Sequence, residues 1–116
     1  MSSIHWLDDV TGSFTNAADW RGGVVPGASD NAILDAAGSA FTVTCGVSET
    51  VRSVRLSSNA TLSLTAGTFD AVKGTGPGAN AGVILVGAGA TLVCGGTVTN
   101  AAGGVILAGV SRRHPL

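Results

Sequence analysis

A short aliphatic motif that occurs twice limits this chain to very few folds. Val83-Ile84-Leu85 returns as Val105-Ile106-Leu107, and a glycine precedes each copy. The spacing is about 22 residues, which suits one coil of a repeat protein whose coils stack on each other. A second motif, Ala-Thr-Leu at 60–62 and 90–92, is spaced more widely. We interpret residues 73–80, which are rich in glycine, as a loop inserted into a coil of the same length.

The segments around these motifs alternate between apolar and polar residues, as strands with one buried face do. Phe41, Val43 and Cys45 alternate with threonines, and Leu62 and Leu64 alternate with Thr and Ser. One coil cannot bury its apolar face alone, so neighbouring coils must stack. The sequence therefore predicts an all-β fold: a single-stranded parallel β-solenoid, specifically a right-handed β-helix with an N-terminal Trp-containing cap.

The domain organisation follows from where the repeat begins and ends. Residues 1–29 lack it and are expected to form the N-terminal cap. Residues 30–110 are expected to form coils of about 22 residues, with the loop insertion at 73–80. Residues 111–116 leave the repeat as an irregular tail.

When residues 73–80 are left out of the residue spacing, the repeat predicts two inward-facing ladders. The first stacks Val54, Ile84 and Ile106, and the second stacks Leu62 and Leu92. Such rungs would form the core, because burial of apolar area stabilises a fold by ~25 cal/mol per Å².

The two cysteines, Cys45 and Cys94, fall at inward positions of the alternating pattern. In this alignment they lie two coils apart, hence ~10 Å by the spacing of stacked strands. A disulfide requires Cα atoms within about 7 Å. We therefore expect two free, buried thiols.

Composition disfavours two classes of function. The chain has 116 residues, of which 45% are hydrophobic and 11% charged, with a net charge of −1. Its basic residues are scattered apart from Arg112 and Arg113, so there is no basic stripe to bind nucleic acid. The longest apolar run, 81–90, is too short and glycine-rich to span a membrane as a helix. The N-terminus has no charged and apolar regions of a classical secretion signal.

The segment before the first coil carries a recognisable set of motifs: Asp19-Trp20, Gly23, Pro26-Gly27 and Asp30. With the Val-rich and Thr-Leu-rich coils that follow, it resembles bacterial surface β-helix proteins of the autotransporter passenger and haemagglutinin-like adhesin type. The resemblance covers about residues 4–110, although the solenoid is much shorter than is usual in that family. It implies an adhesive or scaffolding role and an extracellular or cell-surface location, and it implies no catalytic residue.

The cap is expected to consist of four apolar residues that cover the open end of the first coil, since a solenoid must protect its terminal strands. These residues are Trp6, Phe14, Trp20 and Pro26. The alternative is that the two tryptophans form a carbohydrate-stacking platform.

Few residues could carry out chemistry. The acidic ones gather in the cap and its turns, where aspartate ordinarily binds backbone N–H groups; they are Asp8, Asp9, Asp19, Asp30 and Asp35. A carbohydrate-active enzyme would need two carboxylates and an arginine in one lateral groove, and Arg52 and Arg55 are the candidate arginines. His5 and His114 are isolated, so we interpret them as surface residues and expect no metal or cofactor.

The favoured function is therefore that of a non-enzymatic structural or adhesive module. The last aliphatic rung, Val105, Ile106 and Leu107, would offer an unpaired edge to a second copy of the chain. We expect a homo-oligomer, stacked end to end into a filament, with cell-surface glycans or surface proteins as further partners and no nucleic acid. Two alternatives stay open: a polysaccharide lyase or hydrolase of the β-helix type, and a fragment of a longer adhesin.

Overall fold

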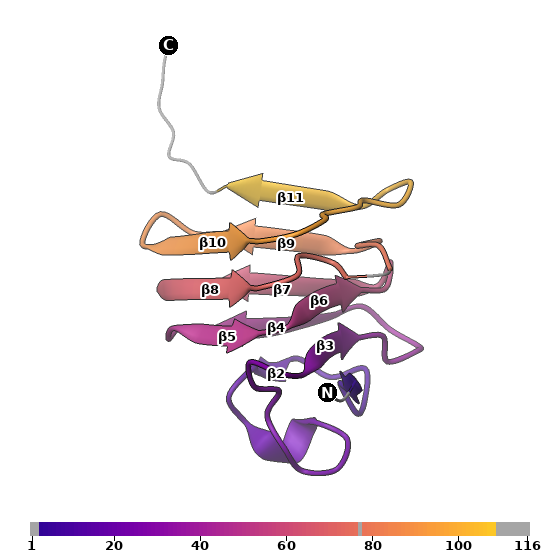
Figure 1. Ribbon diagram of the computed structural model, residues 1–116. Helices are drawn as coiled ribbons and strands as arrows, with labels where there is room; N and C mark the ends of the chain where they lie inside the picture. Colours follow the sequence, from indigo (N-terminus) through magenta and orange to yellow (C-terminus); the bar gives the residue numbers. More distant parts are fainter. Residues whose placement is uncertain (1–2, 77, 109–116) are drawn as a thin grey trace.

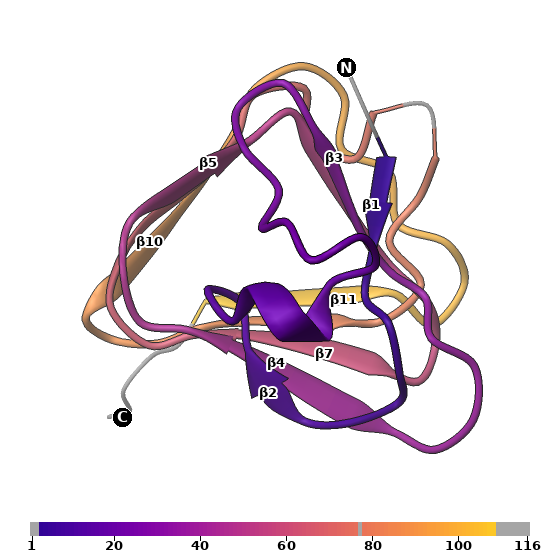
Figure 2. The same cartoon turned by 90° about the horizontal axis from the view of Figure 1, so that it is seen from below.

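The computed structural model describes residues 3–76 and 78–108 as one solenoid of stacked coils. Three parallel sheets form the sides of a triangular prism (Figure 2). Successive strands along the chain belong to different sheets, so each strand pairs with the strand one coil away. Followed from its N-terminus, the chain turns clockwise while moving away from a viewer placed below it (Figure 2), which makes the coil right-handed. The predicted right-handed parallel β-solenoid is confirmed.

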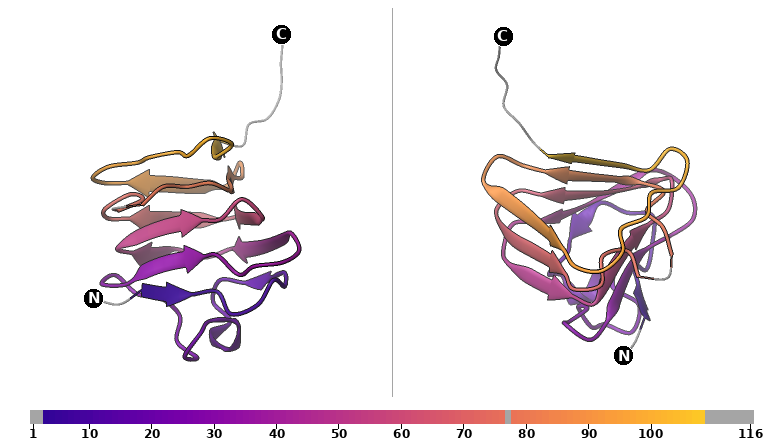
Figure 3. Two further views of the ribbon diagram at one scale, coloured as in Figure 1. Left: turned by 90° about the vertical axis from the view of Figure 1, so that its right-hand side faces the viewer. Right: turned by 45° about the horizontal axis from the view of Figure 1, so that its top comes forward.

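Each sheet takes one strand from successive coils (Figures 1 and 3). The first sheet consists of β1 (Ser3–His5), β3 (Asn31–Leu34) and β6 (Ser53–Leu56). The second consists of β2 (Gly12–Ser13), β4 (Phe41–Cys45), β7 (Ala60–Leu64), β9 (Val83–Val86) and β11 (Val105–Ala108). The third consists of β5 (Glu49–Val51), β8 (Gly67–Ala71) and β10 (Ala90–Cys94). One 3-10 helix, η1 (Ala17–Asp19), lies near the N-terminus.

Inward ladders of apolar side chains fill the prism. In the second sheet, Val43, Leu62 and Ile84 are paired in register and fully buried, and Ile106 continues the ladder half-buried. The alternate residues of the same strands face outward, as the period of two along a strand requires. The alternation seen in the sequence thus sets which face of each strand forms the core.

The observed strand register agrees with the expected one only in part. Ile84 pairs with Ile106 as predicted, but its partner in the preceding coil is Leu62. Val54 belongs to the first sheet, where it pairs with Ala32, and Leu92 pairs with Phe69 in the third sheet. The Ile84–Ile106 part of the first ladder is therefore confirmed, whereas the place of Val54 in it and the Leu62–Leu92 ladder were wrong. The repeated Ala-Thr-Leu motif occurs on two different sides of the prism.

Residues 73–80 are the cause of this error. They were expected to be an inserted loop, but residues 74–76 and 78–80 lie beside β6 and form the first side of the third coil. Gly74 forms a parallel bridge with Thr97, and Asn80 forms another with Asn100. Thr75 and Asn80 are both buried. Without this segment the third coil would lack one of its three sides, so the predicted insertion is corrected to an integral part of the solenoid.

The glycine that precedes each copy of the aliphatic motif has a steric cause. A Cβ added at Gly82 would collide with the carbonyl oxygen of Ala60, and one added at Gly104 would collide with that of Asn80. Each glycine lies against the coil below at the corner where the chain enters the second sheet. Only a residue without a side chain permits that close approach.

Residues 6–30 lie across the N-terminal end of the prism, with η1 beneath the second sheet (Figure 2). Trp6 and Trp20 are buried and meet edge to face, with their ring centroids 5.0 Å apart. Each indole N–H donates to a backbone carbonyl: Trp6 to Val10, and Trp20 to Phe14. Phe14 and Pro26 are also buried. The backbone around Trp20 pairs with residues 5–7, at the C-terminal end of β1.

Candidate functional site

The C-terminal coil presents a partly open cross-section. Leu92 and Ile106 face the prism interior yet are only partly buried, whereas their partners in the coil below, Phe69 and Ile84, are almost fully buried. Among the described residues, β11 pairs with β9 alone. The predicted self-association residues lie here: Val105 and Ile106 are half-buried, and the side chain of Leu107 is 52% exposed.

The outward ladders of the second sheet change from polar to aliphatic along the solenoid. One ladder reads Thr44, Ser63, Leu85 and Leu107, and its neighbour reads Thr42, Thr61, Val83 and Val105. Leu85 is 38% exposed. We call the four aliphatic residues at the C-terminal end of these ladders, Val83, Leu85, Val105 and Leu107, the aliphatic patch. The third sheet changes in the same way, since the exposed Val93 follows Asp70 and Thr50.

Charge is absent from the same part of the chain. Residues 74–108 contain no Asp, Glu, Lys, Arg or His. Edge strands are ordinarily protected by charged side chains, which discourage pairing with another molecule. The last two coils therefore combine a partly open end, an aliphatic outer face and no electrostatic repulsion between copies.

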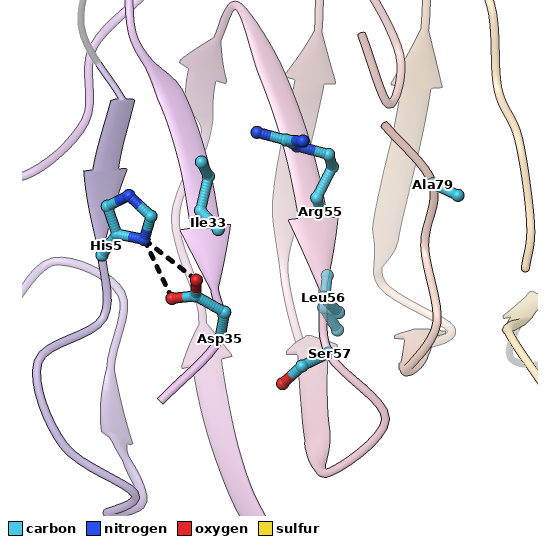
Figure 4. A pocket seen from close by; sticks show the side chains of 7 residues that line it. All are labelled: His5, Ile33, Asp35, Arg55, Leu56, Ser57 and Ala79. Atoms are coloured by element: carbon cyan, nitrogen blue, oxygen red, sulfur yellow. Dashed lines mark hydrogen bonds and ion pairs between the residues drawn. The ribbon is translucent and has the colours of Figure 1, made fainter. Parts of the chain in front are cut away.

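A second feature is a hollow on the outside of the first sheet, about 370 Å³ in volume, which we call the lateral groove (Figure 4). Parallel pairing of β1, β3 and β6 stacks His5, Ile33 and Arg55 side by side on this face. The side chain of His5 lies against Asp35, with Nδ1 2.9 Å from a carboxylate oxygen. The rest of the lining comes from Leu56, Ser57 and Ala79.

Arg55 is the free cation of the lateral groove. Its Nε is buried and has no hydrogen-bond partner among the described residues, and no described carboxylate forms an ion pair with it. The backbone at Gly78 packs against the arginine, because an added Cβ there would collide with Cδ. A smaller hollow of about 320 Å³, near the start of β6, is lined by Arg52 and Lys73 together with Ala28, Ser29 and Val72.

The structure places the acidic residues of the cap in separate turns. Asp9 accepts a hydrogen bond from the backbone N–H of Ser39, and Asp30 accepts one from that of Gly27. Asp19 accepts from the side chain of Asn16, which caps η1. Asp8 is exposed. Asp35 lies in the lateral groove and is the carboxylate among its described lining residues.

From the sequence, His5 was interpreted as an isolated surface residue, Asp35 as a turn aspartate and Arg55 as a candidate arginine of a lateral groove. The structure brings all three to one face. The sequence signal that could have placed these residues together was the register between neighbouring coils. His5 pairs with Ile33, which pairs with Arg55, so residues one coil apart become neighbours. The repeat in the sequence could not reveal that these residues are neighbours, because His5 lies in the segment before residue 30, where the repeat begins. His114 lies outside the described residues, as do positions 109–113 and 115–116.

Cys45 and Cys94 are both free thiols. Cys45 is buried, as expected, and its thiol donates to the carbonyl of Val47. Cys94 is only half-buried, because it lies in the last described strand of the third sheet. Burial raises the pKa of both thiols, so both are protonated and weakly nucleophilic at neutral pH.

Within residues 3–76 and 78–108, no three His, Cys, Asp or Glu side chains gather closely enough to hold a metal ion. None of the helices described there has the length and apolar character required to cross a membrane.

Comparison with known proteins identifies no relative of this chain. The chain matches no protein-family model, and searches of curated proteins and of solved structures find no similar protein.

Proposed function

We propose that this chain is a non-enzymatic structural or adhesive module of a bacterial surface or extracellular assembly, and that it self-associates through its C-terminal coils. The observation that carries the proposal is the change of outward ladders from Thr and Ser to Val and Leu at β9 and β11. Exposed aliphatic side chains bury little apolar area in a monomer, whereas their burial in an interface stabilises the assembly by ~25 cal/mol per Å².

The free edge of β11 supports the same surface. Within residues 3–76 and 78–108, β11 pairs only with β9, so its outer edge can serve as a template for a strand of another chain, and the aliphatic patch adjoins that edge. Because residues 74–108 are uncharged, two copies can approach there without repulsion. A second copy of this chain is the partner that fits best, because β11 is uncharged and the β11 strands of two copies can pair with each other.

The closed N-terminal end bears on the form of the assembly. A filament, the form expected from the sequence, needs the last coil of one chain to meet residues 6–30 of the next. A tail-to-tail dimer joins two C-terminal coils and leaves both caps unchanged. The dimer is therefore the form that this geometry favours, and the filament is the second candidate.

The adhesive part of the proposal, with cell-surface glycans or surface proteins as partners, draws on the resemblance of Asp19-Trp20 and Pro26-Gly27 to surface β-helix proteins.

Sedimentation at increasing concentration tests self-association. The wild type should form species larger than the 11.3 kDa monomer.

Two variants on one outward ladder provide the comparison. Leu107→Lys should restore the monomer, since it puts a charge into the aliphatic patch. Thr44→Lys, on the same ladder but in the first coil, should leave association unchanged. A wild-type protein that stays monomeric at high concentration would overturn the self-association proposal, and a ladder of ever larger species would identify the filament.

A further inference from the structure

We infer that the lateral groove is a binding site for an acidic sugar unit, in which Arg55 holds the carboxylate of the sugar. The inference rests on the adhesive part of the proposed function and names its ligand class. It is independent of self-association, because the groove lies on the first sheet and the aliphatic patch lies on the second.

Arg55 supplies the anion-binding group. Its buried Nε finds no acceptor among residues 3–76 and 78–108, and a buried N–H without a partner costs free energy. Close packing at Gly78 limits how far the arginine stem can move. A guanidinium held in place in this way can bind a planar carboxylate through two parallel N–H bonds.

The opposite side of the groove restricts the charge of the ligand. Figure 4 shows the His5–Asp35 pair across Ile33 from the guanidinium of Arg55. Asp35 repels an anion that approaches it, and the repulsion grows with the charge of that anion. The groove therefore favours a ligand whose anionic group lies at the Arg55 side and whose uncharged hydroxyl groups lie near Asp35.

The lining between these groups suits a sugar ring. Ile33 lies between the His5–Asp35 pair and Arg55 and offers apolar surface to the C–H groups of the ring, and Ala79 adds apolar surface on the far side of Arg55. Asp35 and the hydroxyl of Ser57 can accept hydrogen bonds from ring hydroxyls. His5 and Arg55 are separated by two strand spacings, hence ~10 Å, which accommodates one ring with its carboxylate. The volume, about 370 Å³, is at the small end of the range for ligand sites.

Titration of the full chain with glucuronate, followed by backbone amide shifts in nuclear magnetic resonance, tests the inference. Glucuronate should shift the amides around Ile33, Arg55 and Ser57 in a saturable way. Glucose lacks the carboxylate and acetate lacks the ring, so each should bind about tenfold more weakly or not measurably.

Arg55→Gln should weaken glucuronate binding by about tenfold or more, whereas Arg21→Gln removes the same charge from an exposed position and should leave it unchanged. Absence of a saturable shift in the groove, equal binding of acetate and glucuronate, or an Arg55→Gln variant that binds normally would each overturn the inference. Sedimentation of the same samples reports on self-association separately, so failure of one proposal is distinguishable from failure of the other.

Discussion

Phe69 of β8 pairs directly with Leu92 of β10, and its ring also meets Phe14 of the N-terminal segment edge to face, with centroids 5.3 Å apart. One buried side chain therefore contacts both the segment that lies across the first coil and the strand of the last complete coil. In a solenoid, each coil otherwise contacts only its neighbours, so stability depends on such interfaces between them.

Phe69→Ala should lower the free energy of unfolding by about 3–5 kcal/mol, because it removes a buried aromatic ring and leaves a cavity between coils. Urea denaturation measures the change. The adjacent Thr68 is exposed, so Thr68→Ala should cost less than about 0.5 kcal/mol. Similar losses for the two variants would contradict the register of β8.

Glu49 should make the stability dependent on pH. Its register partner is Phe69, and burial raises the pKa of its carboxyl above the usual value. The folded state therefore favours the protonated form, and the stability contributed by this group is lost as pH rises through the folded pKa. Glu49→Gln should raise the melting temperature at pH 7 and lose that advantage as the pH falls. A variant that melts below the wild type at pH 7 would contradict this.

Asn80 should be important for the third coil. It is fully buried, and its side chain binds both the N–H and the carbonyl of Gly82, the carbonyl of Val105 and the side chain of Asn100. Asn80→Ala should cost about 1–3 kcal/mol because buried backbone groups lose their partners. Asn100→Ala, at an exposed position, should cost less, and chemical denaturation of the two variants compares them. A neutral Asn80→Ala would restore the interpretation of residues 73–80 as a dispensable loop.

Cys94 should report on self-association. It is half-buried in β10, at the end of the third sheet, so a second copy on the C-terminal coil would cover it further. The rate of its alkylation by iodoacetamide should fall as protein concentration rises, whereas the buried Cys45 should react slowly throughout. In the Leu107→Lys variant, the rate at Cys94 should no longer depend on concentration. Mass spectrometry of each labelled peptide gives both rates.

The sequence by itself determined the type of fold. Alternation in segments such as Phe41 to Cys45 set which side chains face inward, and the recurrence of Val83-Ile84-Leu85 set the coil length. These are local properties, because the period of two along a strand is a consequence of backbone geometry. The glycine before each copy of the motif also follows locally, from the tight corner that it occupies.

Only the tertiary structure decided which coils and which sides meet. Coils of a triangular solenoid tolerate unequal turn lengths, so a repeated motif such as Ala-Thr-Leu can lie on different sides, and counting residues cannot tell them apart. The same freedom brings His5 beside Asp35 and places Arg55 one strand away from Ile33. The lateral groove and the aliphatic patch both exist because pairing between strands, rather than spacing along the chain, sets which side chains become neighbours.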